Sequence, residues 1–225
     1  MPYREGDVIA TFLSESAGKL TAIARGGRRS SKRLGGTLEP FHTIQIDFED
    51  TGKELVTLNE ATVATLRGQL VQNLDALDAA GTAMRWGRFL FPTRSEEPIA
   101  WNAVVRFLDA VEENPAQAKI ELIRVGFDLL AAFGYAMDFE KCVRCGKTCP
   151  EASSALMDPA RGGTVCRACG GGPILLDAVT RVLLARQFDG SPTENRDAQI
   201  RLALDIIETA MAAHAGLDPH HGTSQ

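Results

Sequence analysis

In the first seventy residues, apolar and polar positions alternate in short runs that predict β-strands. Ile44, Ile46 and Phe48 alternate with Gln45 and Asp47, the pattern of a sheet with one buried face. Glycine-containing turn signals separate the runs. The predicted strands cover 8–13, 19–24, 43–48 and 54–58. Four short strands in succession predict a small β-barrel.

From about residue 72, apolar residues fall three and four positions apart, which predicts amphipathic helices. The clearest helix covers 116–134, with Gly134 as its expected cap and an apolar stripe of Ile120, Ile123, Phe127 and Leu130. Similar spacing occurs at 71–90, 100–113, 173–188 and 195–215. We therefore expect an α+β protein with a β-domain over 1–70 and an α-helical domain over 71–225.

Length and composition are those of a globular protein. The chain has 225 residues, enough for one or two domains, and 44% of them are hydrophobic. No apolar run approaches the roughly 20 residues that span a membrane, and the N-terminus is charged where a signal peptide is apolar. These features predict a cytoplasmic protein, whose cysteine pairs more often bind metal than form disulfides.

Two cysteine pairs have the spacing of a metal site. They form a C-x2-C array, 20 residues and a second C-x2-C array, and a glycine follows each pair. Four thiolates so arranged match tetrahedral Zn²⁺ with no open position, which is the structural type of zinc site. The predicted ligands are Cys142, Cys145, Cys166 and Cys169. They predict a loop-rich zinc module over 140–172, inserted between helices.

Other interpretations of these cysteines stay open. They include reduced buried thiols, a site that has lost its metal, and a redox C-x-x-C pair, for which two copies around a glycine-rich loop are a poor match. Cys149 can replace Cys145 only through a C-x6-C spacing, which makes a poorer turn, so we expect it to stay free.

A basic segment interrupts an otherwise acidic chain. The net charge is -5, yet residues 1–36 hold seven lysines and arginines against three acids, leaving -9 for the rest. Glycines bracket the segment, and no acid lies within it. Its cations are Arg25, Arg28, Arg29, Lys32 and Arg33. On an exposed loop between strands they predict phosphate contacts rather than base recognition, and a merely solvated hairpin is the alternative.

The remaining candidates are weaker. His42 is expected to pack or lie at the surface, and Trp86 and Trp101 to be core or interhelix residues. We find no Walker-type phosphate loop, nucleophile elbow or carboxylate cluster, so the sequence does not predict an enzyme.

Together these features resemble the bacterial RecO family of recombination mediators. The resemblance is carried by "GDVIATFLSESAGKLTAIARGGRRSSKRLGGTLEPF" (6–41), by "GFDLLAAFGYAMDFEKCVRCG" (126–146) and by "CRAC" (166–169). It implies an N-terminal OB-fold, a helical C-terminal domain and a zinc module on the four paired cysteines. It also matches the five cations above to the family's basic barrel loop.

The resemblance implies a function in DNA repair. Such proteins bind single- and double-stranded DNA and anneal complementary strands. With RecR they help to load RecA onto strands covered by single-stranded-DNA-binding protein (SSB), whose acidic C-terminal tail they contact. No motif assigns residues to the RecR or SSB surfaces. The family also implies a cytoplasmic, nucleoid-associated protein without catalytic residues.

One departure from the family concerns the barrel. Members usually have another strand before "PYREGD", where this chain begins, and an OB barrel has five strands whereas we count four. We therefore expect the first strand to be missing, two unpaired edges, and a start codon assigned about ten residues late. Two other functional classes stay open: a zinc-stabilised RNA-binding or transcription-associated module, and a zinc-dependent enzyme.

Overall fold

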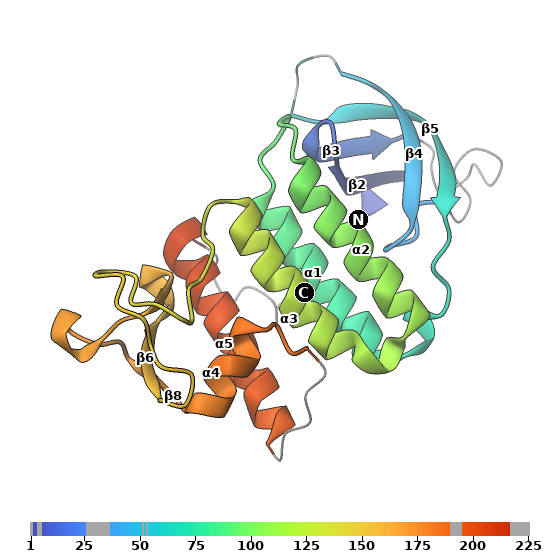
Figure 1. Ribbon diagram of the computed structural model, residues 1–225. Coiled ribbons are helices and arrows are strands. Elements are labelled where there is room, and N and C mark those ends of the chain that lie inside the picture. Colours follow the sequence, from blue (N-terminus) through green and yellow to red (C-terminus); the bar gives the residue numbers. More distant parts are fainter. Residues whose placement is uncertain are drawn as a thin grey trace. The chain divides into compact units, whose positions relative to one another are not determined.

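The computed structural model describes residues 2–3, 6–25, 37–50, 52, 54–189 and 195–216. Its contacts divide the chain into two compact units, Met1–Ala118 and Lys119–Gln225. Strands come first and helices follow, which confirms the α+β class (Figure 1). The first unit contains two helices besides the strands, and the domain boundary near residue 70 stays a prediction.

The first unit begins with a sheet in which the strand order is β1-β2-β3-β5-β4. Neighbouring strands are antiparallel except β3 and β5, which pair in parallel through Ala22–Val56 and Ile23–Thr57. The strands are β1 (Pro2–Tyr3), β2 (Asp7–Ser14), β3 (Gly18–Ala24), β4 (Thr43–Glu49) and β5 (Val56–Thr65). Three of the long strands fall where the sequence predicts them, whereas β5 begins two residues after its predicted start at 54 and continues to Thr65, seven residues beyond its predicted end at 58.

The expected count of four strands is corrected to five. Pro2 and Tyr3 pair with Val8 and Asp7 of β2 as a strand of two residues. The apolar pattern could not reveal so short a strand, because two residues show no alternation. The first strand of the sheet is therefore present but short.

One apolar cluster is shared by the four long strands of the sheet. Its buried members come from β3 and β5, and Phe12 of β2 and Ile44, Ile46 and Phe48 of β4 pack against them. Because the strands contribute to one common core, the sheet is curved into a barrel (Figure 1). A five-stranded, partly open barrel of this kind has the architecture of an OB-fold.

Two helices complete the first unit. Helix α1 (Leu74–Leu90) follows the short 3₁₀ helix η1 (Leu70–Gln72) and is capped by Asn73, whose side chain accepts the amide of Ala76. Helix α2 (Pro98–Glu113) begins with a proline at its first position, where no backbone donor is needed. The 3₁₀ helix η2 (Pro115–Gln117) follows it. Trp86 of α1 is fully buried, as predicted for a core residue.

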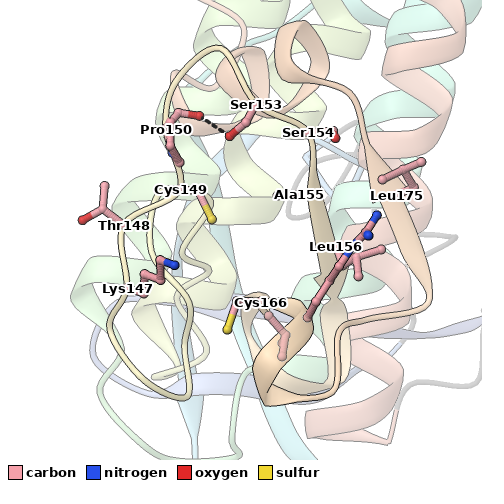
Figure 2. A pocket seen from close by; sticks show the side chains of 12 residues that line it. Lys147, Thr148, Cys149, Pro150, Ser153, Ser154, Ala155, Leu156, Cys166 and Leu175 are labelled. Atoms are coloured by element: carbon pink, nitrogen blue, oxygen red, sulfur yellow. Dashed lines mark hydrogen bonds between the residues drawn. The ribbon is translucent and has the colours of Figure 1, made fainter.

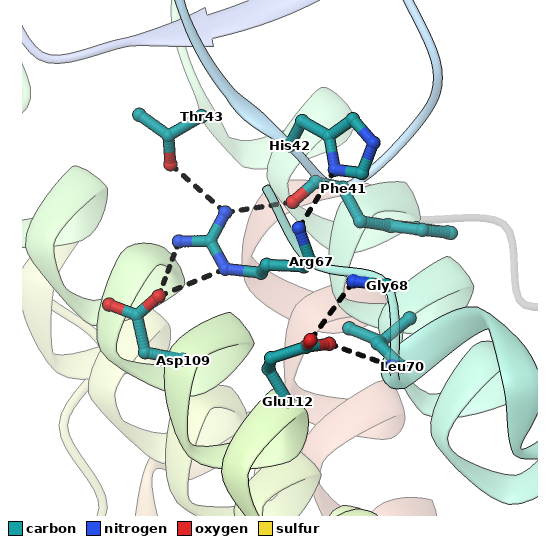
Figure 3. Close-up of polar contacts among 8 residues, drawn as sticks. All are labelled: Phe41, His42, Thr43, Arg67, Gly68, Leu70, Asp109 and Glu112. Carbon is teal, nitrogen blue, oxygen red and sulfur yellow. Dashed lines mark hydrogen bonds and ion pairs between the residues drawn. The ribbon is translucent and has the colours of Figure 1, made fainter. Parts of the chain in front are cut away.

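A buried arginine joins the barrel to these helices. Arg67 is 1% exposed and follows β5. Its Nε and Nη2 donate to Oδ1 of Asp109 on α2 at 2.9 and 2.5 Å, and its Nη1 donates to the Phe41 carbonyl and the Thr43 hydroxyl (Figure 3). Its own amide donates to Nδ1 of His42 at 3.2 Å. His42 thus has a structural role, in line with the prediction.

Glu112 stabilises the start of η1. Its carboxylate accepts the amides of Gly68 and Leu70 at 2.9 and 2.7 Å (Figure 3), and also that of Gln69 at 2.9 Å. These N–H groups have no carbonyl partner within a helix. Burial raises the pKa of Glu112, but the three amides and the nearby Arg67 outweigh it and hold the pKa below its ordinary value. The carboxylate is thus a capping anion contributed from another helix.

The second unit combines three helices with a small sheet. The helices are α3 (Ala118–Ala132), α4 (Ala178–Ala185) and α5 (Arg196–Ala215). The sheet has the order β7-β6-β8 and consists of β6 (Ala155–Asp158), β7 (Gly163–Thr164) and β8 (Ile174–Leu176). The predicted apolar stripe of α3 is buried, and Gly134 has a positive φ of 86°, as expected near a helix end.

One predicted helix is partly wrong. Residues 174–176 form strand β8, which pairs with β6, and the helix begins only at Ala178. Asp177 ends the apolar run and caps the helix, since its side chain accepts the amide of Thr180 at 2.9 Å. Three apolar residues directly before a helix are too few to show a periodicity of their own. The apolar pattern therefore does not separate this strand from the helix that follows it.

Candidate functional site

The first cysteine pair lies in a tight turn after α3. Asp138 prepares the turn, because its Oδ1 accepts the amides of Glu140 and Lys141, both at 2.8 Å. Cys142 then closes it: its amide donates to the Lys147 carbonyl, and its carbonyl accepts the amide of Gly146. Gly146 has a φ of 70°, which glycine adopts without strain. We call residues 141–148 the first knuckle.

The second cysteine pair repeats this arrangement. The amide of Cys169 donates to the Cys166 carbonyl at 2.9 Å, and the amide of Gly171 donates to the same carbonyl at 3.1 Å. Gly170 after the pair has a φ of 102°. The two cysteines belong to the 3₁₀ helix η4 (Arg167–Cys169) and its capping residue. We call residues 166–171 the second knuckle.

The two knuckles bring four sulfurs together. The Sγ atoms of Cys142, Cys145, Cys166 and Cys169 all lie within 4.8 Å of one another, and those of Cys145 and Cys166 are 3.8 Å apart. Four sulfurs at about 2.3 Å from one tetrahedral ion are about 3.8 Å apart. The donor set therefore fits a tetrahedrally bound metal ion. The spacing prediction that these cysteines converge is confirmed.

Backbone donors prepare this site for a cation. The amide of Cys166 donates to Sγ of Cys142 at 3.3 Å. This bond, with the amides of Arg144 and Cys145, lowers the pKa of Cys142 to about 6. Hydrogen bonds with the sulfurs of Cys166 and Cys145 raise the pKa of Cys169 to about 12. Backbone N–H groups thus favour the thiolate of Cys142, the form in which a cysteine binds a metal ion.

Cys149 lies outside the sulfur cluster. Its Sγ lies 4.0 Å from the Thr164 hydroxyl, and its amide donates to the Glu140 carbonyl. The described part of the chain therefore places the fifth cysteine beside the metal site rather than in it.

A second buried arginine holds the loops of this module. Arg181 of α4 is 2% exposed. Its guanidinium donates to four carbonyls, those of Phe139, Pro150, Glu151 and Ser153, at 2.6 to 3.2 Å. These carbonyls belong to segments without regular secondary structure, where backbone groups need other partners. Arg181 thus replaces the hydrogen bonds that a sheet would supply.

A small pocket lies beside the knuckles. Its volume is about 240 Å³. Lys147, Thr148, Cys149 and Pro150 lie along one side, and Leu156 and Leu175 lie across from them (Figure 2). Its further lining residues include Cys166 and Arg167 of the second knuckle. None of the twelve lining residues carries a carboxylate. We call this space the module pocket.

The predicted basic loop lies mostly outside the described residues. Arg25 is exposed in the turn that follows β3, as predicted for a strand connection. Arg28, Arg29, Lys32 and Arg33 lie outside the described part of the chain. The described residues resume at 37, and Leu38 packs against the barrel core before β4 begins. The segment therefore connects β3 to β4 on an OB-type barrel.

The fold and the site define a class: OB-type proteins with a helical unit that carries a module of four clustered thiols, a donor set that fits a metal ion. Two family models cover most of the sequence, "Recombination protein O N terminal" over residues 1–67 and "Recombination protein O C terminal" over residues 71–223. The chain belongs to the RecO family. In the described residues, no helix is long and apolar enough to cross a membrane.

Curated relatives carry the same family name. The DNA repair protein RecO of Anaeromyxobacter sp. strain K is 32% identical over 193 residues, which cover 84% of this chain and 75% of the relative. The RecO protein of Geobacter sulfurreducens is 29% identical over 80% of this chain and 73% of its own length. That of Desulfatibacillum aliphaticivorans is 29% identical over 96% and 89%.

The sequence does not predict two buried arginines that hold the structure together. Arg67 and Arg181 are among the largest fully buried side chains, yet each looks like an ordinary surface arginine in the printed sequence. A signal did exist for Arg181, which lies three residues before the buried Leu184 on the apolar stripe of α4.

Proposed function

We propose that this protein is a DNA-binding recombination mediator that anneals complementary single strands. With RecR, it would help to load RecA onto single-stranded DNA covered by SSB, at the nucleoid in the cytoplasm. The observation that carries this proposal is the cationic segment from Arg25 to Arg33 between β3 and β4 of an OB-type barrel. Membership of a family whose relatives are named DNA repair proteins supports it.

The mechanism follows from charge. Annealing requires two strands of like charge to approach each other, so a cationic surface must screen their repulsion without selecting bases. Phosphate contacts do this because every nucleotide carries the same phosphate. Five such contacts to a single strand give a slope of log K against log salt of about -3.5. No covalent bond changes, so this function needs no catalytic residue.

We further propose that the metal is Zn²⁺ and that its role is structural. Cys142, Cys145, Cys166 and Cys169 would hold it, and four thiolates leave no position for a substrate. When bound, the ion supplies a crosslink between the two knuckles and no acid–base chemistry. The residues around it then fix the loops, chiefly through the four carbonyls to which the Arg181 guanidinium donates.

A strand-annealing assay on SSB-coated DNA, with and without RecR, tests the function. The proposal predicts annealing by the protein alone and RecA loading only when RecR is also present. The second candidate function is RNA binding, since basic OB loops also suit RNA. Competition between single-stranded DNA and RNA of equal length separates the two, and a clear preference for RNA would contradict the DNA-repair proposal.

A further inference from the structure

The two knuckles carry a second group of cations, separate in sequence from those of the barrel loop. All four are exposed, and within the described part of the chain none forms an ion pair with a carboxylate. We call them the knuckle cations: Lys141, Arg144, Lys147 and Arg167. One guanidinium nitrogen of Arg144 donates to the Cys169 carbonyl at 3.2 Å, which leaves its other N–H groups available and ties it to the second knuckle.

The acids of the module are mostly engaged elsewhere. Asp158 pairs with Arg161, and Glu151 pairs with Arg186. Asp138 accepts two backbone amides at the base of the first knuckle. Four thiolates and one Zn²⁺ sum to -2, and Glu140 and Asp138 add -2, so the four knuckle cations balance the charge of the two knuckles. Because Asp138 is half-buried and bound to backbone amides while the four cations are exposed, the cations are the groups that an anion in solution can reach.

The module pocket adds an apolar surface to this charge. Lys147 and Arg167 line it, and Leu175, which is 65% exposed, forms part of its wall. The hydroxyls of Thr148 and Ser154 also line it. Its volume lies below the about 300–1,000 Å³ typical of sites for drug-sized molecules, so it suits one flat group of modest size.

We propose that the knuckle cations and the module pocket form a second nucleic-acid site, which binds single-stranded DNA. The cations bind successive phosphates, and the pocket takes one unpaired base from the same strand. This inference rests on the proposed DNA-binding function and places a further contact in the unit that lies after residue 118.

The chemistry favours a single strand over a duplex. In a duplex both faces of each base are covered by its neighbours, so a base can enter the pocket only after unstacking, which costs a few kcal/mol. In a single strand there is no base pair to break, so a base can leave the stack at a lower cost. No aromatic side chain lines the pocket, so base contact is weak and independent of sequence, and the phosphates supply most of the affinity. Such a site suits a protein that must hold strands of any sequence.

Cys149 makes the site directly testable, because its thiol lines the pocket and lies outside the sulfur cluster. The experiment uses the zinc-loaded full chain and measures alkylation of Cys149 by N-ethylmaleimide with peptide mass spectrometry. A 30-nucleotide oligothymidylate is expected to slow this alkylation severalfold. A blunt duplex of equal length is expected to have little effect.

Substitution of three cations tests the phosphate contacts. R144Q/K147Q/R167Q is expected to abolish the protection of Cys149 and to reduce the salt slope of single-strand binding by about 2, at about 0.7 for each phosphate. R201Q, which removes an exposed charge from α5, is the control and should change neither. The triple variant must have the same zinc content and melting temperature as wild type, which shows that its module is folded.

The outcomes separate this inference from the proposed function. If wild type binds oligothymidylate while Cys149 stays equally reactive and the triple variant keeps its slope, the second site is overturned and the barrel function stands. If an acidic peptide with an aromatic residue protects Cys149 and oligothymidylate does not, the pocket is a protein site and the inference is again overturned. If wild type binds no single-stranded DNA, both proposals fail.

Discussion

Arg67 and Asp109 form an ion pair with one member inside the protein and the other at its surface. The arginine side chain is 1% exposed and the aspartate side chain 54% exposed, and two guanidinium nitrogens donate to one carboxylate oxygen. The same guanidinium also binds the Phe41 carbonyl and the Thr43 hydroxyl. The arginine therefore joins the start of β4, the end of β5 and α2 within the first unit.

Replacing Arg67 should destabilise the first unit more than replacing Asp109. Arg67→Met leaves a half-buried carbonyl and a half-buried hydroxyl without their donor, and we expect a loss of about 2–4 kcal/mol. Asp109→Asn keeps an oxygen acceptor at the surface and should cost about 1 kcal/mol. Urea denaturation measures both, with Arg88→Met on the exposed face of α1 as the control. Equal losses for the two variants would contradict this role of Arg67.

Glu112 should make stability depend on pH. Its folded pKa lies below its ordinary value, so the carboxylate contributes stability above about pH 4.5, and this contribution is lost as the pH falls through the folded pKa. Glu112→Gln should therefore cost about 1–3 kcal/mol at pH 7, with the difference from wild type narrowing below pH 4.5. Thermal melts between pH 3 and 8 measure this. Glu113→Gln, an exposed neighbour, should match wild type throughout.

Loss of a knuckle cysteine should release the metal, whereas loss of Cys149 should not. Cys142→Ser removes the most buried of the four sulfurs, and we expect zinc content near zero and a lower melting temperature for the second unit. Cys149→Ser should retain one zinc ion per chain. Metal analysis by mass spectrometry with calorimetry measures both. Zinc retained at full stoichiometry in Cys142→Ser would contradict the four-sulfur site.

Removing four cations of the barrel loop should weaken DNA binding in a salt-dependent way. If R28A/R29A/K32A/R33A loses four phosphate contacts to a single strand, its salt slope becomes shallower by about 2.8. Fluorescence anisotropy with oligothymidylate over a range of salt concentrations measures the slope. Arg88→Ala serves as the single-charge control. A slope equal to that of wild type would remove this loop from the mechanism.

Local patterns predicted much of the structure. The alternation in β4 and the stripe of α3 depend only on neighbouring residues, and both proved correct. The four knuckle cysteines were also predictable, because C-x2-C spacing constrains each pair within a single turn. In these cases the residues that determine the structure lie within about one or two turns of the chain.

Features that depend on distant residues could not be predicted. Arg67 and Asp109 are 42 positions apart, and no local pattern pairs them. Arg181 binds carbonyls up to 42 positions away. Strand β8 exists because Ile174 and Leu176 meet β6, while the same apolar letters also suit a helix. The sequence shows which side chains are apolar, but the partners of isolated polar side chains emerge only in three dimensions.

The parallel pairing of β3 with β5 has a consequence for how this family can diverge. The Ala22–Val56 pair and the β4–β5 ladder determine the register of the barrel, and both ladders are formed by described residues that lie outside the β3–β4 connection. Doubling such a connection costs about 0.6 kcal/mol in chain entropy. The β3–β4 segment can therefore change in length at little cost in chain entropy while the pairing of the strands is kept.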